Sequence, residues 1–224
     1  MYLAENTVHV WQYHLAAAGA GGDCSAADLC ESEALRAGTL DVTRRRNFLA
    51  SRLSLRRLLG RYLGCPPRQV PLASGARGKL FLATMDGALH FNTSHSGDRL
   101  MHAVARTPLG IDIERVQDTV PWTLSDKFLT LSEHAALRAL PIDRQPDSFF
   151  AAWTRKEAYI KAHGGERYAH QFEVSMAPWA QRALVSDGVE PFAPLRWTVM
   201  DIDAGCGYRG ALAIEGARPA ICYR

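Results

Sequence analysis

The segment Gly110-Ile111-Asp112-Ile113-Glu114 is an apolar run interrupted by two carboxylates. Alternate residues of a β-strand point to the same side, so a strand over residues 109–114 places Asp112 and Glu114 on one face. An Asp-x-Glu pair that stands alone on a strand is more often an exposed edge than a functional site. A functional interpretation therefore depends on what the rest of the chain brings to this strand.

A second segment supplies further charged groups, since residues 153–161 are Trp-Thr-Arg-Lys-Glu-Ala-Tyr-Ile-Lys. Glu157 and Lys161 are four residues apart and therefore share one face of a predicted helix. Together with the two strand acids, they can bring three carboxylates and a lysine to one point. Such a set suits a magnesium site that acts on phosphate, because Mg²⁺ prefers oxygen ligands and the lysine balances the charge that develops.

Composition limits the classes of protein that fit. The chain has 224 residues, 47% of them hydrophobic, and a formal net charge of +3. This charge permits an anionic substrate but is too small to indicate a nucleic-acid binder. The N-terminus has no basic segment followed by a long apolar one, and no run approaches the roughly 20 apolar residues of a membrane span. We expect a cytoplasmic protein without nucleic-acid or membrane partners.

Hydrophobic periodicity predicts an α+β chain. A long helix over residues 44–63, capped by Asp41 or Thr43, has its apolar residues on one stripe and ends at Gly64. The other helices are predicted at 25–37, 122–128, 132–140 and 149–163, and strands at 7–13, 79–84, 88–92, 101–105, 109–114, 172–176, 195–201, 208–214 and 220–223. The four strands between residues 79 and 114 are expected to form one small, mostly antiparallel sheet. Two similar halves, residues 1–106 and 107–224, are the simplest assembly.

Other polar segments have both a functional and a structural interpretation. The stretch Phe91-Asn92-Thr93-Ser94-His95-Ser96-Gly97 places hydroxyl, amide and imidazole groups on a strand, where they can hold a phosphate, although a single histidine is more often structural. Lys79 after Gly78 is either a phosphate contact or a solvated hairpin lysine, and its surroundings lack the spacing of a nucleotide-triphosphatase loop. The arginines between residues 44 and 61 form a solvated, partly paired face or grip an anionic substrate.

In this order and spacing, Gly78-Lys79, FNTSHSG at 91–97, GIDIE at 110–114 and WTRKEAYIK at 153–161 resemble the 4'-phosphopantetheinyl transferase superfamily, in particular its longer single-chain, surfactin-synthetase-activating type. The resemblance extends from about residue 44 to residue 174. It implies transfer of the phosphopantetheine arm of coenzyme A to a serine of an apo acyl or peptidyl carrier protein, with release of adenosine 3',5'-bisphosphate. The implied fold has two α+β halves related by a pseudo-twofold axis, with the active site between them in a monomer.

The resemblance also implies residue roles. Asp112, Glu114 and Glu157 would hold Mg²⁺ against the pyrophosphate of coenzyme A. Glu157 would take the serine proton, directly or through a water. Lys161 would stabilise charge on the pyrophosphate, so that Glu157, Lys161 and Asp112 form the catalytic set. The implied contacts to coenzyme A are Lys79, Ser94, His95, Lys156, Arg44 and Arg52. Arg45 and Arg46 are alternatives for the arginine contacts.

Two other classes of protein remain open on the sequence. A metal-dependent nuclease would use the same acids and lysine on a phosphodiester, although its Glu-x-Lys motif has a spacing of two residues rather than the four between Glu157 and Lys161. A non-catalytic protein could bind acidic partners through the arginine-rich helix, and this hypothesis predicts that Asp112→Ala leaves function intact. Neither class accounts for the FNTSHSG stretch.

Overall fold

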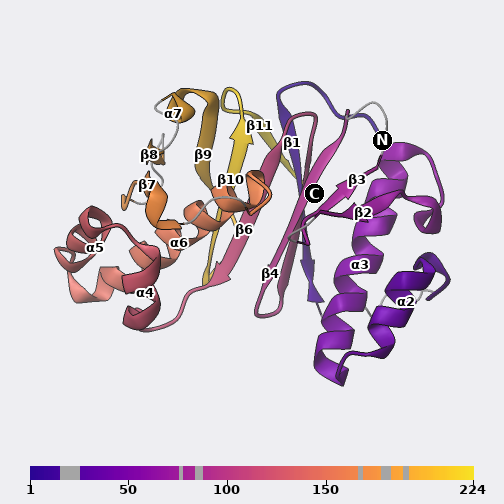
Figure 1. Ribbon diagram of the computed structural model, residues 1–224, viewed down its shortest axis with the longest axis horizontal. Helices are drawn as coiled ribbons and strands as arrows, with labels where there is room; N and C mark the ends of the chain where they lie inside the picture. Colours follow the sequence, from indigo (N-terminus) through magenta and orange to yellow (C-terminus); the bar gives the residue numbers. More distant parts are fainter. Residues whose placement is uncertain (16–25, 76–77, 84–87, 166–168, 178–182, 189–191) are drawn as a thin grey trace.

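The computed structural model describes residues 1–15, 26–75, 78–83, 88–165, 169–177, 183–188 and 192–224 (Figure 1). It contains a four-stranded sheet of order β11-β1-β5-β4 and a three-stranded sheet of order β6-β10-β9. The long helix α3 packs on the first of these sheets and the long helix α6 on the second. The prediction of a mixed α and β chain is therefore confirmed.

The strands are β1 (Thr7–His14), β2 (Leu72–Ser74), β3 (Leu80–Leu82), β4 (His90–Ser96), β5 (Arg99–Ala105), β6 (Leu109–Arg115), β7 (Glu173–Val174), β8 (Leu184–Ser186), β9 (Trp197–Ile202), β10 (Tyr208–Glu215) and β11 (Ala220–Tyr223). The α-helices are α2 (Glu31–Gly38), α3 (Val42–Leu63), α4 (Trp122–Phe128), α5 (Leu131–Arg138), α6 (Gln145–Ala162) and α7 (Ala193–Arg196). Short 3₁₀ helices cover Ala26–Asp28, Pro67–Gln69, Ile142–Arg144 and Ala169–Gln171.

Helix α3 ends where its sequence predicts and begins at Val42, two residues before the predicted start, with Asp41 as its N-cap. The Asp41 carboxylate accepts hydrogen bonds from the backbone N–H groups of Thr43 and Arg44, and Gly64 closes the helix in the left-handed conformation with φ 68°. Leu55 and Leu59 are buried within the core between α3 and the first sheet. The apolar stripe therefore faces the sheet, as its periodicity indicates.

The structure corrects the predicted starts of two helices. The single helix predicted over residues 25–37 is a 3₁₀ turn and then α2, because Cys30 has an extended backbone and its N–H donates to Glu33 Oε2 at 3.1 Å. Residue 25 lies outside the described residues. Helix α6 starts at Gln145, four residues before the predicted start, because Pro146 is tolerated in the first turn of a helix.

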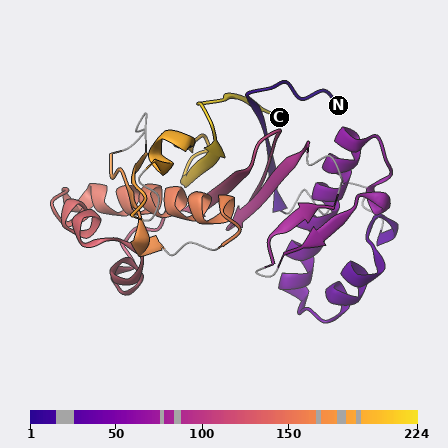
Figure 2. The same ribbon diagram turned by 45° about the horizontal axis from the view of Figure 1, so that its top comes forward.

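The four strands predicted between residues 79 and 114 do not form one sheet. Strand β3 pairs with β2 in a separate hairpin, β4 and β5 belong to the first large sheet, and β6 belongs to the second. The two large sheets share a core between them, with α3 and α6 on the outer faces (Figure 2). The buried side chains of this shared core include Val8, Val10, Met101, Ile111, Ile113, Met200 and Leu212. Because Ile111 and Ile113 face this core, the intervening residue Asp112 faces α6.

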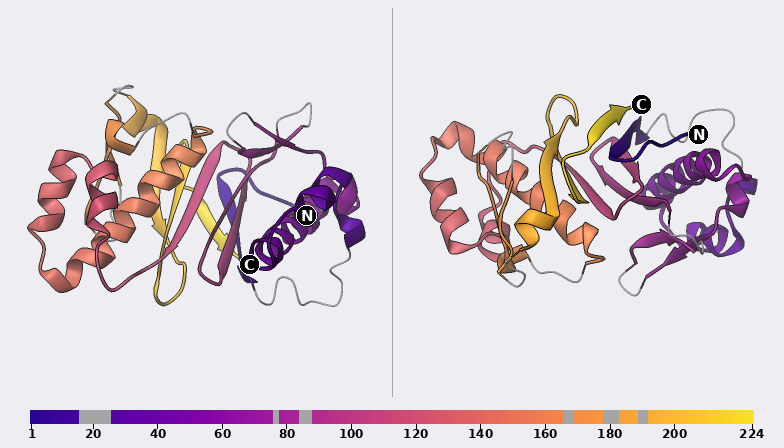
Figure 3. Two further views of the ribbon diagram at one scale, coloured as in Figure 1. Left: turned by 60° about the horizontal axis from the view of Figure 1, so that its bottom comes forward. Right: turned by 90° about the horizontal axis from the view of Figure 1, so that it is seen from above.

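The last strand returns to the first sheet. Strand β11 pairs in parallel with β1, with Thr7 opposite Ala220. In both views of Figure 3 the N- and C-termini lie near each other, beside α3 and the first sheet. The division of the chain into residues 1–106 and 107–224 stays a prediction. Strand β11 does not follow this division, because it belongs to the second range but pairs with β1 of the first.

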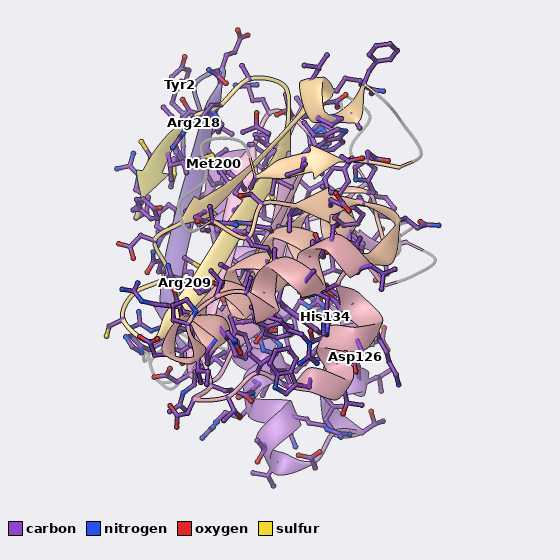
Figure 4. All side chains as sticks on the ribbon, turned by 90° about the vertical axis from the view of Figure 1, so that its left-hand side faces the viewer. Tyr2, Asp126, His134, Met200, Arg209 and Arg218 are labelled. Carbon is purple, nitrogen blue, oxygen red and sulfur yellow. The ribbon has the colours of Figure 1, made fainter. Side chains whose placement is uncertain are left out.

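The outer end of the second half is formed by α4 and α5 (Figure 4). His134 Nε2 lies 2.7 Å from Asp126 Oδ1, and Figure 4 shows the two side chains next to each other. The Arg138 guanidinium lies over the Trp122 ring at 4.4 Å from its centroid. These contacts hold α4 against α5.

Among the described residues, no helix combines the length and the apolar composition needed to cross a membrane.

Strand β6 crosses α6 at Gly110. A Cβ atom at this position would lie 2.1 Å from the Ala158 carbonyl oxygen and 2.4 Å from the Ala162 nitrogen. Both contacts are with helix backbone, which cannot rotate away as a side chain can. The glycine of the GIDIE motif therefore permits the close approach of strand and helix that brings Asp112 beneath α6.

We predict that Gly110→Ala lowers the free energy of unfolding by about 3 kcal/mol, because the added methyl group forces β6 and α6 apart. Urea unfolding measures the effect. The matched control is Gly38→Ala at the end of α2, where a Cβ meets nothing within 4 Å and where alanine should be neutral or slightly stabilising. Equal stability of the two variants would contradict the close packing.

Candidate active site

The two large sheets meet where β4 lies beside β6 (Figure 1). These strands are joined by side chains of β4 that accept hydrogen bonds from backbone N–H groups of β6. The pairs are Asn92 Oδ1 with Ile111 N at 2.9 Å, Ser94 Oγ with Ile113 N at 3.3 Å and Ser96 Oγ with Arg115 N at 3.1 Å. The partners are 19 residues apart in each pair, so the strands run parallel. We call this junction of β4, β6 and the three hydrogen bonds the seam.

Asp112 lies at the seam with its side chain directed toward α6. It is 2% exposed, and its Oδ1 accepts hydrogen bonds from Lys161 Nζ at 2.6 Å and from Ser94 Oγ at 2.7 Å. Its Oδ2 is buried and has no hydrogen-bond partner among the described residues. A carboxylate oxygen buried in this way is costly unless something else binds it.

The other two predicted acids lie near Asp112. Glu114 Oε2 accepts a hydrogen bond from Ser96 Oγ at 2.6 Å, and the Trp153 side chain also hydrogen-bonds to Glu114. Burial raises the pKa of Glu157, and the negative charges of Asp112 and Glu114 raise it further. The predicted convergence of the three acids thus has electrostatic consequences in the structure.

Burial disfavours the ionised form of each of the three acids. Burial raises the pKa of Asp112 despite Lys161 and Ser94, and burial and the Asp112 charge raise that of Glu114. Oxygen donors and the buried Asp112 Oδ2 suit a hard divalent cation such as Mg²⁺. In the described part of the chain, however, no three acidic, histidine or cysteine side chains form a metal-binding group as they stand.

Lys161 and His95 supply positive or protonatable groups beside the acids. Lys161 Nζ donates to Ser94 Oγ at 2.9 Å as well as to Asp112. His95 lies on β4, where desolvation of the imidazole and then the Lys161 charge lower its pKa below the ordinary value of 6.5. The imidazole is therefore neutral at pH 7 and can gain a proton when an anion binds next to it.

Lys79 connects the turn before β3 to the end of α6. It follows Gly78, which has φ 79°, in the turn before β3. Its Nζ donates to the carbonyl oxygens of Lys161 at 2.5 Å and Ala162 at 3.1 Å, which are the last residues of α6. The predicted phosphate-contacting lysine therefore caps the helix that carries Glu157, where a cation also interacts favourably with the helix dipole.

A cavity of about 290 Å³ lies beside this helix end. It is lined by Gly78, Lys79, Leu80, Phe91, Asn92, Thr93, Lys161, Gly164 and Gly165. Lys79 before β3 and Lys161 on α6 thus border one hollow. An anionic group of moderate size fits such a surface.

Lys156 faces away from the acids, into the core. It is 0% exposed, and its Nζ lies 2.7 Å from Glu133 Oε2 and donates to the carbonyls of Ala169 and Phe172. This ammonium is not available to a phosphate, so the predicted contact of Lys156 with coenzyme A is corrected to a structural role. The physical reason is that the residue before Glu157 lies about 100° around the helix, on its buried side.

The two arginines assigned to coenzyme A also have other surroundings. Arg52 Nε lies 3.3 Å from Glu33 Oε1 with only 12% of its side chain exposed, so its charge is used within the first half. Arg44 is exposed in the first turn of α3, with its Nε 3.4 Å from Asp41 Oδ2. Neither arginine has a described contact with Asp112, Glu114 or Glu157, so their roles stay predictions.

Sequence reasoning did not single out three residues that the structure connects with the acids. Ser96 and Trp153 hydrogen-bond to Glu114, and Asn92 closes the seam beside Asp112. The signal for two of them was present, because polar residues at 92, 94 and 96 alternate along a strand and so share one face.

Comparison with known proteins identifies similar chains. The family model described as the 4'-phosphopantetheinyl transferase superfamily matches residues 108–205. The chain is 33% identical over 229 residues to 4'-phosphopantetheinyl transferase HetI of Nostoc sp. (strain PCC 7120), which covers 99% of this chain and 94% of that protein. It is 32% identical to 4'-phosphopantetheinyl transferase psf-1 of Bacillus pumilus, over 53% of this chain and 50% of that protein. It is 34% identical to 4'-phosphopantetheinyl transferase gsp of Aneurinibacillus migulanus, over 54% and 49%.

We predict that Glu157→Gln stabilises the metal-free protein by about 1 kcal/mol at pH 7 to 8. The folded state raises the pKa of Glu157, so its ionised form is penalised above the folded pKa, whereas below the ordinary value of 4.5 the acid is neutral in both states. The gain should therefore disappear near pH 4. Urea unfolding in EDTA across this range measures it.

Glu5→Gln, which neutralises an exposed acid, is the control and should change stability little at either pH. Absence of any gain for Glu157→Gln at neutral pH would show that the carboxylate is not under electrostatic strain.

Proposed function

The chain belongs to the 4'-phosphopantetheinyl transferase superfamily, and from this premise we propose how its own residues transfer the phosphopantetheine group of coenzyme A to a carrier protein. Coenzyme A is the family's substrate and carrier proteins are its partners. The observation that carries the proposal is the buried Asp112 carboxylate, which is held between Ser94 and Lys161 and leaves Oδ2 without a partner among the described residues.

Asp112, Glu114 and Glu157 would hold the magnesium ion in this proposal. The donor set supports it, because the three acids are carboxylates whose pKa values are raised by burial and by one another. When bound, Mg²⁺ supplies the positive charge that makes the diphosphate a better electrophile. Lys161, which now neutralises Asp112, would then be free to interact with the pyrophosphate.

Glu157 would act as the general base. A raised pKa brings a carboxylate closer to neutral pH and makes it a better proton acceptor for a serine hydroxyl. The proton passes to Glu157 either directly or through one water. The serine oxygen then attacks the phosphorus that carries the phosphopantetheine arm, and adenosine 3',5'-bisphosphate leaves.

The phosphates of coenzyme A would enter the cavity between Lys79 and Lys161. These two cations border the hollow from different halves of the protein. His95, on β4, would gain a proton as the anion approaches. Lys79 would exchange its carbonyl partners on α6 for phosphate oxygens.

We also propose that the two halves are related by a pseudo-twofold axis and act as one monomer. Each half places one long helix on a largely antiparallel sheet. The site draws Ser94 and His95 from the first half and the acids from the second. Cytoplasmic localisation remains part of this proposal. The comparisons give no support to a nuclease.

The first test is intact-mass spectrometry of an apo carrier protein incubated with the enzyme, coenzyme A and Mg²⁺. We expect the carrier to gain the mass of one phosphopantetheine, and EDTA to prevent the gain. Glu157→Gln should lower the rate by at least 100-fold while it retains coenzyme A binding, because general-base catalysis contributes typically 10²- to 10⁴-fold. A fully active variant would remove Glu157 from the base role.

Lys79→Met should raise KM for coenzyme A about tenfold with little change in kcat, because the lysine would bind the substrate phosphates and not the reacting serine. Steady-state kinetics with coenzyme A varied measures the split. Lys127→Met, at the exposed end of α4, is the matched control and should leave both constants unchanged. An unchanged KM in Lys79→Met would restrict this lysine to capping α6.

A further inference from the structure

Each serine of the seam makes hydrogen bonds in two directions. Ser96 Oγ accepts from the Arg115 N–H at 3.1 Å and donates to Glu114 Oε2 at 2.6 Å. Ser94 Oγ accepts from the Ile113 N–H at 3.3 Å and donates to Asp112 Oδ1 at 2.7 Å. The same hydroxyl groups therefore join the halves and hold the carboxylates.

The hydrogen-bonding capacity of Ser94 is fully used. A hydroxyl has one hydrogen and two lone pairs. In Ser94 the hydrogen points to Asp112, and the lone pairs accept from the Ile113 N–H and from Lys161 Nζ at 2.9 Å. Ser94 could donate to a phosphate only by releasing Asp112. Its position beside the substrate is therefore better explained by what it does to the acid.

We propose that Ser94 and Ser96 are positioning residues, which orient Asp112 and Glu114 toward the metal and tie that orientation to closure of the seam. The proposal rests on the proposed function in one respect, namely that these two acids are metal ligands. Hydrogen bonds from outer residues fix the rotamer of a ligating carboxylate, and their loss typically weakens metal binding 10- to 100-fold.

Asn92 provides the comparison within the same strand. Its Oδ1 accepts from the Ile111 N–H at 2.9 Å, so it closes the seam as the serines do. No hydrogen bond is described between the Asn92 side chain and either Asp112 or Glu114. Removing Asn92 should therefore disturb the junction without releasing an acid, whereas removing Ser96 should do both.

The test is isothermal titration of Mn²⁺ into the full chain without carrier protein or coenzyme A. We expect Ser96→Ala to weaken Mn²⁺ binding about tenfold. Ser96→Thr, which keeps the hydroxyl, should stay within about twofold of the parent protein. Asn92→Ala should do the same, although we expect thermal unfolding to show that this variant is less stable. Ser96 is the chosen position because, unlike Ser94, it has no described bond to Lys161.

Asp112→Asn separates failure of the inference from failure of the proposed function. If this variant binds Mn²⁺ as the parent does, the proposed metal site is wrong and the positioning role falls with it. If Asp112→Asn loses Mn²⁺ while Ser96→Ala keeps parental affinity, the positioning role alone is overturned. Should Ser96→Ala fail to fold, Ser96→Cys replaces it. A thiol is a weaker hydrogen-bond donor of similar size, so this variant should bind Mn²⁺ with intermediate affinity. Parental affinity for Mn²⁺ in Ser96→Cys would overturn the positioning role.

Discussion

The burial of the Asp112 carboxylate is the constraint on which the rest of the structure depends. A buried carboxylate costs several kcal/mol unless it is paired and hydrogen-bonded. Its partners come from two other elements, since Lys161 lies on α6 and Ser94 on β4. Stabilising this one charge therefore fixes a strand, a helix and the edge of the other sheet relative to one another. Gly110 makes the arrangement possible, because only a residue without a Cβ lets β6 approach α6 so closely.

The same arrangement places stability and function in opposition. Three acids lie near one described ammonium partner, and burial raises the pKa of each of them. Binding of a cation or a proton relieves this repulsion. Elsewhere the second half balances its buried charges, as the Lys156 pair with Glu133 and the Arg155 pair with Asp201 show.

The segment Trp153–Lys161 combines, in one helix, residues that contact the acids of the site and buried residues that hold the helix in place. Trp153 hydrogen-bonds to Glu114, whereas Arg155 and Lys156 are 0% exposed and hold α6 to its own half. A motif of this sort specifies the framework of the site as well as its chemistry. The stretch from Phe91 to Gly97 does the same on β4, where alternate side chains join two sheets that share no backbone ladder at this edge.

Periodicity along the sequence was enough to determine which residues share a face within one element. It indicated Asp112 with Glu114 on a strand and Glu157 with Lys161 on a helix, and Gly64 marked the end of α3. Only the tertiary structure decided that Lys79 caps α6, that Lys156 is paired with Glu133, that the serines hold the acids, and that β11 joins the first sheet. The physical reason is that periodicity reports the direction of a side chain relative to its own backbone, whereas a hydrogen-bond partner from a distant segment is chosen by how the elements pack.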